Sequence, residues 1–99
     1  MRVIFAPAAE ADLLEISKDI RRESQARAET FIDEIVDHCY TLTDMPRRHP
    51  LVPRYEHSGI RRCVHGKYLI FYRVREDAVE IVHILYGGMD YESMLFPPE

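Results

Sequence analysis

The stretch that decides the fold is residues 60–86, which reads IRRCVHGKYLIFYRVREDAVEIVHILY. Two runs within it, 68–74 and 79–86, are rich in β-branched and aromatic residues, and the polar residues between them are typical of a turn. A third run, 60–64, ends at a His-Gly pair that gives a second turn signal. The three runs predict an antiparallel β-meander with short connections.

Apolar and polar residues alternate poorly along this meander. Residues 69–72 are consecutive hydrophobic or aromatic residues, and residues 81–86 are interrupted only by His83. A sheet with one face on a core and the other in water should alternate. Because a small chain has only enough helix to cover one face, we expect another polypeptide to cover the second face or an edge strand.

Length and composition indicate one domain, spanning residues 1–99. The hydrophobic content of 46% and charged content of 30% are ordinary for a globular protein. No apolar run approaches the ~20 residues that a membrane-spanning helix needs, and the apolar start of the chain is too short for a signal-peptide core. We therefore expect a cytoplasmic protein.

The charge is distributed unevenly along the chain. Residues 46–75 carry eight Arg or Lys and one Glu, whereas the net charge of the whole chain is −4. Such a basic block is typical of a protein with an acidic or phosphate-bearing partner. The alternative is a set of solvated arginines on loops and strand edges.

No residue pattern indicates a metal site, a cofactor or a catalytic centre. The histidines lack ligand spacing, and Cys39 and Cys63 lack metal-motif spacing. In a cytosolic protein two such cysteines are expected to be buried apolar residues rather than a disulfide. Cys63 and His65 share a strand face, but nothing marks the cleft and third group that a catalytic pair needs, so we expect them to pack.

The first half of the chain predicts a short strand and two helices. Residues 2–5 suit a strand added to the meander, and Pro7 suits the first position of a helix. The apolar stripe of this helix comprises Ala9, Leu13, Ile16 and Ile20. Ser24 is a suitable N-cap for a second helix, with the stripe Ala28, Phe31, Ile32, Ile35, Cys39 and Leu42. The short link predicts an antiparallel helical hairpin.

The remaining segments connect and close the fold. Three prolines within residues 43–59 exclude a helix or central strand and predict an extended crossover. After Gly87-Gly88, Asp90 is placed to cap one short helical turn that ends near Leu95. The order β-α-α-β-β-β with a short C-terminal segment predicts an α+β fold, in which the helical hairpin packs on the antiparallel meander.

With these pieces in order, the chain resembles the ParE toxins of the ParE/RelE superfamily of bacterial type II toxin–antitoxin systems. The resemblance covers nearly the whole chain. It rests on the ordered set PAAEADL (7–13), AETFI (28–32), IRR (60–62), GKYLIFYRV (66–74), VEI (79–81) and the closing Gly-x-x-Asp (87–90).

The resemblance implies a toxin neutralised by a ParD-like antitoxin whose C-terminal segment wraps the hairpin and sheet. ParE members poison DNA gyrase, which blocks replication and growth and supports plasmid maintenance. It further implies a non-enzymatic inhibitor that contacts DNA only through the antitoxin complex. RelE members share the fold but cut mRNA in the ribosomal A site.

Compared with the RelE pattern, this chain lacks the expected catalytic groups. Leu69 stands at the arginine position, Gly88 and Met89 near the basic position, and Met94 near the C-terminal tyrosine, although Tyr91 is close. RNA cleavage needs a base and cations, which these residues do not supply. The ribonuclease remains an alternative, with Arg61, Arg62, Lys67, Arg73, His65 and His83 as possible substitutes.

There are departures from the ParE pattern as well. Tyr86 stands where the family often has His, and Met89 stands where an Arg commonly precedes the Asp. A toxin that has lost activity and serves only as antitoxin partner is therefore a third reading.

Two contact surfaces are predicted. The antitoxin surface combines the helical stripe with two basic strand residues that suit an acidic wrapping peptide: Leu13, Ile16, Ile20, Phe31, Ile35, Arg61 and Arg73. The target surface is the C-terminal segment, whose apolar residues have no obvious core left to fill: Asp90, Tyr91, Met94, Leu95 and Phe96. The alternative for Leu95 and Phe96 is that they pack on the sheet edge.

Overall fold

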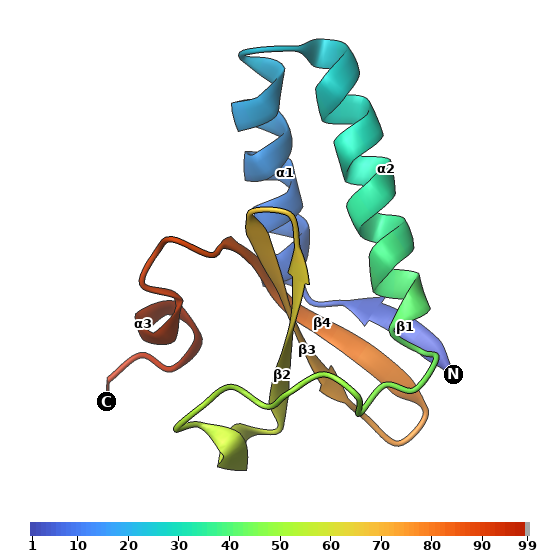
Figure 1. The fold of residues 1–99 in the computed structure, drawn as a ribbon, viewed down its shortest axis with the longest axis vertical. Coiled ribbons are helices and arrows are strands. Elements are labelled where there is room, and N and C mark those ends of the chain that lie inside the picture. The colour runs from blue at the N-terminus through green and yellow to red at the C-terminus, as the bar shows by residue number, and fades with distance from the viewer. Residues whose placement is uncertain (99) are drawn as a thin grey trace.

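The computed structural model describes residues 1–98 and confirms the predicted α+β element order (Figure 1). Glu99, the last residue of the predicted domain, lies outside the described residues. The elements are β1 (Arg2–Phe5), α1 (Pro7–Arg21), α2 (Gln25–Thr41), the 3-10 turn η1 (Glu56–Ser58), β2 (Ile60–His65), β3 (Tyr68–Val74), β4 (Ala78–Tyr86) and α3 (Tyr91–Leu95). In residues 1–98 no helix has the length and apolar character needed to cross a membrane.

The four strands form one sheet in the order β1-β4-β3-β2. Strands β2, β3 and β4 make the predicted antiparallel meander. Strand β1 pairs parallel with β4, so the sheet is mixed rather than wholly antiparallel. Parallel pairing requires a long connection between strands, and here the two helices, the crossover and two further strands separate β1 from β4.

The helices begin as the sequence predicts. Pro7 occupies the first turn of α1, and Ala6 at the N-cap makes no side-chain cap hydrogen bond. The Ser24 hydroxyl accepts the Arg27 amide of α2 at 3.1 Å. The two helices form an antiparallel hairpin over one face of the sheet (Figure 1). Their stripe and that face make the main core, which includes Ala9, Ile16, Phe31, Ile35, Cys39, Ile70, Tyr72, Val79, Ile81 and Ile84.

The second face of the sheet is covered by the chain itself, which corrects the expectation of another polypeptide there. Val52, Ile60, Phe71 and Leu85 are buried in a second cluster. The crossover and the C-terminal segment pack against it through Tyr55, Tyr91, Leu95 and Phe96. Leu51 forms an isolated bridge with Arg61, so the crossover also shields part of the β2 edge.

A β-bulge explains the poor alternation of β4. Tyr72 pairs with Ile81 but Phe71 pairs with His83, so Val82 is an extra residue in the ladder. The extra residue shifts the two-residue period. Ile84 therefore returns to the main core and Leu85 joins the second cluster.

Candidate functional site

The outer edge of β4 is only half covered. Strand β1 has four residues and β4 has nine, and the β1 pairing stops at Phe5, opposite Ile81. The Ala6 amide still donates to the Ile81 carbonyl at 2.9 Å, and the chain then turns away into α1. Within residues 1–98, no strand lies beside the rest of this outer edge of β4.

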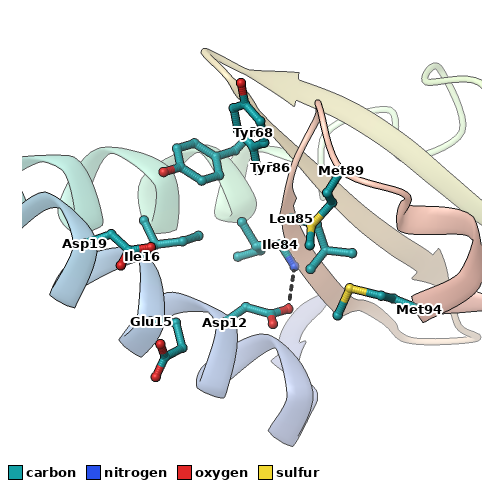
Figure 2. Close-up of a pocket in the computed structure, with 10 residues that line it drawn as sticks. All are labelled: Asp12, Glu15, Ile16, Asp19, Tyr68, Ile84, Leu85, Tyr86, Met89 and Met94. Carbon is teal, nitrogen blue, oxygen red and sulfur yellow. Dashed lines mark hydrogen bonds between the residues drawn. The ribbon is translucent and has the colours of Figure 1, made fainter.

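One side chain of helix α1, that of Asp12, makes polar contacts at this open edge. The Ile84 amide donates to Oδ2 of Asp12 at 2.9 Å (Figure 2). The same oxygen lies 2.7 Å from Nδ1 of His83. The two contacts fix the start of α1 against the end of β4. The backbone amide and carbonyl groups nearer the end of β4 have no partner from α1.

A groove follows the open edge, between α1 and the segment that ends the chain (Figure 2). We call it the edge groove, and its volume is about 440 Å³. Its apolar and aromatic lining comes from Ile16, Tyr68, Ile84, Leu85, Tyr86, Met89 and Met94, and its charged lining from Asp12, Glu15 and Asp19. The charged residues are all acidic, so this groove has a negative potential.

A second groove, which we call the hairpin groove, lies between the tip of the helical hairpin and the β2–β3 turn. Its lining comprises Asp19, Ile20, Glu23, Arg27, Phe31, Glu34, His65, Gly66, Lys67 and Tyr68. The Phe31 ring makes edge contacts with His65 and Tyr68, at centroid distances of 5.5 and 5.3 Å. This groove has an aromatic floor and a rim of mixed charge.

The two grooves meet at Asp19 and Tyr68, which line both. Partial burial raises the pKa of the Tyr68 hydroxyl, and the Asp19 carboxylate and Tyr86 raise it further. The phenol therefore stays neutral at physiological pH and is available as a hydrogen-bond donor. Together the grooves form one continuous surface from the hairpin tip to the C-terminal segment.

The structure brings only some of the predicted antitoxin residues to this surface. Ile16 lines the edge groove, and Ile20 and Phe31 line the hairpin groove. Leu13 packs against the main core with partial exposure. Ile35 has no exposed surface.

The two predicted basic residues lie elsewhere and have internal partners. Arg61 donates to the carbonyls of Arg47 and His49 at 3.0 and 2.7 Å. Arg73 donates to the Ser58 carbonyl at 3.3 Å and lies 3.7 Å from the Glu80 carboxylate. Neither lines a groove, and their role in antitoxin binding stays a prediction.

The predicted target residues divide into two groups. Asp90 and Met94 are exposed. Tyr91, Leu95 and Phe96 pack on the second cluster, so the view that no core remained for them is wrong. Three contacts hold this segment to the rest of the fold: the Tyr55–Phe96 ring stack at 4.0 Å, the Arg62–Tyr91 hydrogen bond at 2.7 Å and the Arg54–Glu92 ion pair at 2.6 Å.

A hydrogen-bonded chain of Cys63, His38 and His65 lies between α2 and β2. Nε2 of His38 is 3.3 Å from Sγ of Cys63, and its Nδ1 is 2.8 Å from Nδ1 of His65. Burial raises the pKa of the Cys63 thiol and lowers that of His38, which the neighbouring His65 lowers further. A buried neutral thiol is not an activated nucleophile. Both cysteines are free and buried, as predicted.

The basic residues considered for RNA cleavage do not converge on one cleft. Arg62 contacts α3, His65 contacts α2 and His83 contacts α1, each through the hydrogen bonds described above. Within residues 1–98, no group of three potential ligands could hold a metal ion. The arrangement contains two grooves lined by apolar and charged side chains rather than a cluster of cations around a reactive centre.

Sequence reasoning missed most of the edge groove. It used only the apolar stripe of the first helix, so Glu15 and Asp19 were given no role, and it treated Tyr86 and Met89 only as departures from the ParE pattern. The available signal was a difference in strand length. The strand before the first helix has about four residues and the last strand is twice as long, so the first cannot cover the whole edge of the last.

This fold and its grooves define a small α+β protein with a continuous grooved surface along the helical hairpin and β4. The sequence model of one family, described as ParE toxin of type II toxin-antitoxin system, parDE, matches residues 3–91. The chain therefore belongs to the ParE toxin family.

A solved structure shows the same fold. It is described as a chromosomal ParDE TA system from P. aeruginosa, and one of its chains superposes with a TM-score of 0.74 and 20% sequence identity. The match covers 87% of this chain and 95% of the other. No curated protein gives a significant match.

Proposed function

We propose that this ParE-family chain is a growth-inhibiting toxin that acts in the cytoplasm and is neutralised by a ParD-like antitoxin. The observation that carries the proposal is the family match over residues 3–91, together with the continuous pair of grooves on the same domain. The antitoxin segment would lie in these grooves and contact Ile16, Ile20 and Phe31. Ile20 is partly exposed, and Ile16 and Phe31 are buried residues that form part of the groove linings, which suits an apolar peptide anchored in a groove.

The toxic activity is proposed to be inhibition of DNA gyrase through protein–protein contact, without catalysis. The C-terminal segment supports this because it presents Asp90 and Met94 on a scaffold held by Tyr55, Arg54 and Arg62. A positioned, partly apolar segment of this kind suits contact with a protein target. The alternative of RelE-like mRNA cleavage is disfavoured by the scattered, internally bonded cations.

Antitoxin binding is tested by co-purifying the chain with its ParD-like antitoxin. The expected result is a stable complex that Ile20→Glu weakens, because a carboxylate at this partly exposed position would enter the apolar part of the hairpin groove. Val64→Glu is the matched control, since Val64 is 66% exposed and lies on β2 outside both grooves. Failure of the unmodified chain to bind would contradict this part.

The target is tested by a supercoiling assay with purified gyrase and antitoxin-free protein, beside a ribosome-programmed mRNA cleavage assay. Inhibited supercoiling with intact mRNA is expected. Cut mRNA with unaffected gyrase would replace the gyrase proposal with the ribonuclease. No effect in either assay, with antitoxin binding retained, would indicate a toxin that has lost activity.

A further inference from the structure

The open edge of β4 still has backbone groups available for pairing. The Gly87 amide donates to the Lys67 carbonyl at 2.9 Å, so residue 87 faces β3. Successive residues of a strand face opposite edges. The Tyr86 amide and the Ile84 carbonyl therefore face outward, on the same side as the Ile84 amide that Asp12 binds.

The walls of the edge groove differ in chemistry. On the α1 side lie the carboxylates of Asp12, Glu15 and Asp19, and on the opposite side lie Met89 and Met94 (Figure 2). Glu15 and Asp19 pair only with Lys18 and Arg22 on their own helix, at exposed sites where such pairs contribute little. The groove therefore favours a ligand that is basic on one side and apolar on the other.

We propose that the edge groove takes an extended, basic segment of the antitoxin, which adds a strand beside the last residues of β4. This inference rests on the proposed function, and it specifies the partner's conformation and charge. The segment would lie beside β4 beyond Phe5, where β1 ends, and it would pair with the Ile84 carbonyl and the Tyr86 amide. Its alternate side chains would be Lys or Arg facing α1, and apolar residues facing Met89 and Met94.

An extended segment fits better than a helix because the available contacts are main-chain groups. A helix satisfies its own backbone and would leave the Tyr86 amide to water, whereas a strand would pair with it. The segment proposed here is basic, whereas the sequence suggested an acidic peptide that would bind Arg61 and Arg73. In the structure those arginines already bind internal acceptors.

The charge requirement is tested with Glu15→Lys. Glu15 is exposed, and it lines the edge groove but not the hairpin groove. Glu29→Lys is the matched control, an equal charge change at an exposed position of α2 outside both grooves. Binding of the full-length ParD-like antitoxin is measured by calorimetry. We expect Glu15→Lys to weaken binding by about tenfold or more and the control to bind as the unmodified chain does.

Strand addition is tested by amide hydrogen exchange at Tyr86 in the free toxin and in the complex. Its exchange should slow by about tenfold or more on binding, because the amide would gain a main-chain acceptor. The Val52 amide, which donates to the Ile60 carbonyl at 2.9 Å and lies outside both grooves, serves as an internal reference.

The outcomes separate the inference from the proposed function. If the unmodified chain binds the antitoxin but Glu15→Lys binds equally well, or Tyr86 exchange is unchanged, the inference fails and the proposed function stands. If the antitoxin does not bind at all, both fail. Protection of the Tyr86 amide in an antitoxin-free dimer would assign the edge to a second copy of the chain and overturn the inference.

Discussion

The Asp12 carboxylate accepts the backbone amide of Ile84 at 2.9 Å, across the boundary between α1 and β4 (Figure 2). Both residues belong to partly or fully buried parts of the fold. Replacing Asp12 with Ala would leave that amide without its acceptor, and we expect a loss of about 1–3 kcal/mol in the free energy of unfolding, measured with urea. Asp12→Asn should cost less, because its amide oxygen still accepts.

The control for this prediction is Glu10→Ala, an exposed acidic residue near the same helix N-terminus. It shares the favourable position relative to the helix dipole but has no bond to β4. Equal losses for the two alanine variants would show that the Asp12–Ile84 bond contributes nothing beyond the helix dipole.

Stability should fall as the pH drops below about 6.5, and His38 should account for much of this. Its pKa is lowered from 6.5 by burial and then by the neighbouring His65, so the unfolded chain binds the proton more readily than the folded protein. Stability therefore rises with pH between the lowered folded pKa and 6.5, and it is fully present above that window. Thermal unfolding from pH 5 to 8 measures the slope.

The variant that tests this assignment is His38→Gln, which keeps hydrogen-bonding groups but does not titrate. It should flatten the pH dependence of the melting temperature. The slope that remains should come from His49, whose pKa is also lowered by burial and then by Arg48. An unchanged slope would assign the pH dependence to other groups.

The helical hairpin and the meander could be predicted because local signals agree with the tertiary structure. The Ser24 cap and the apolar stripe that contains Phe31 favour a helix, and the aromatic run at 68–74 favours a strand. These segments are α2 and β3 in the structure. The parallel pairing of β1 was not predictable from such signals. A short apolar strand has no pattern that distinguishes a parallel partner from an antiparallel one.

Two features could not be predicted because they depend on contacts between residues distant in sequence. These features are the covering of the second sheet face and the formation of the edge groove. Tyr55 stacks on Phe96 across 41 positions of sequence, and periodicity carries no information at that range. The bulge at Val82 similarly depends on pairing with β3. Of the candidate site, the stripe residues Ile16, Ile20 and Phe31 could be predicted, whereas the acidic wall of the edge groove required knowing that β1 stops at Phe5.

The two helix N-caps should respond in opposite directions to complementary changes. Ser24→Ala removes the hydroxyl that accepts the Arg27 amide and should cost about 1 kcal/mol. Ala6→Ser adds an acceptor where the cap has none, at an extended backbone conformation that suits it, and should stabilise by about 0.5–1 kcal/mol. Urea unfolding of both variants checks the signs. Two changes of the same sign would contradict this account of the caps.

The C-terminal segment should depend on Phe96 more than on Met94. The Phe96 ring lies parallel to that of Tyr55, with centroids 4.0 Å apart, whereas Met94 is 44% exposed. Phe96→Ala should therefore cost about 1–3 kcal/mol, and Met94→Ala less than about 0.5 kcal/mol. Limited proteolysis should cut the segment faster in Phe96→Ala alone. Equal cleavage of the two variants would show that the Arg54–Glu92 and Arg62–Tyr91 contacts hold the segment without the stack.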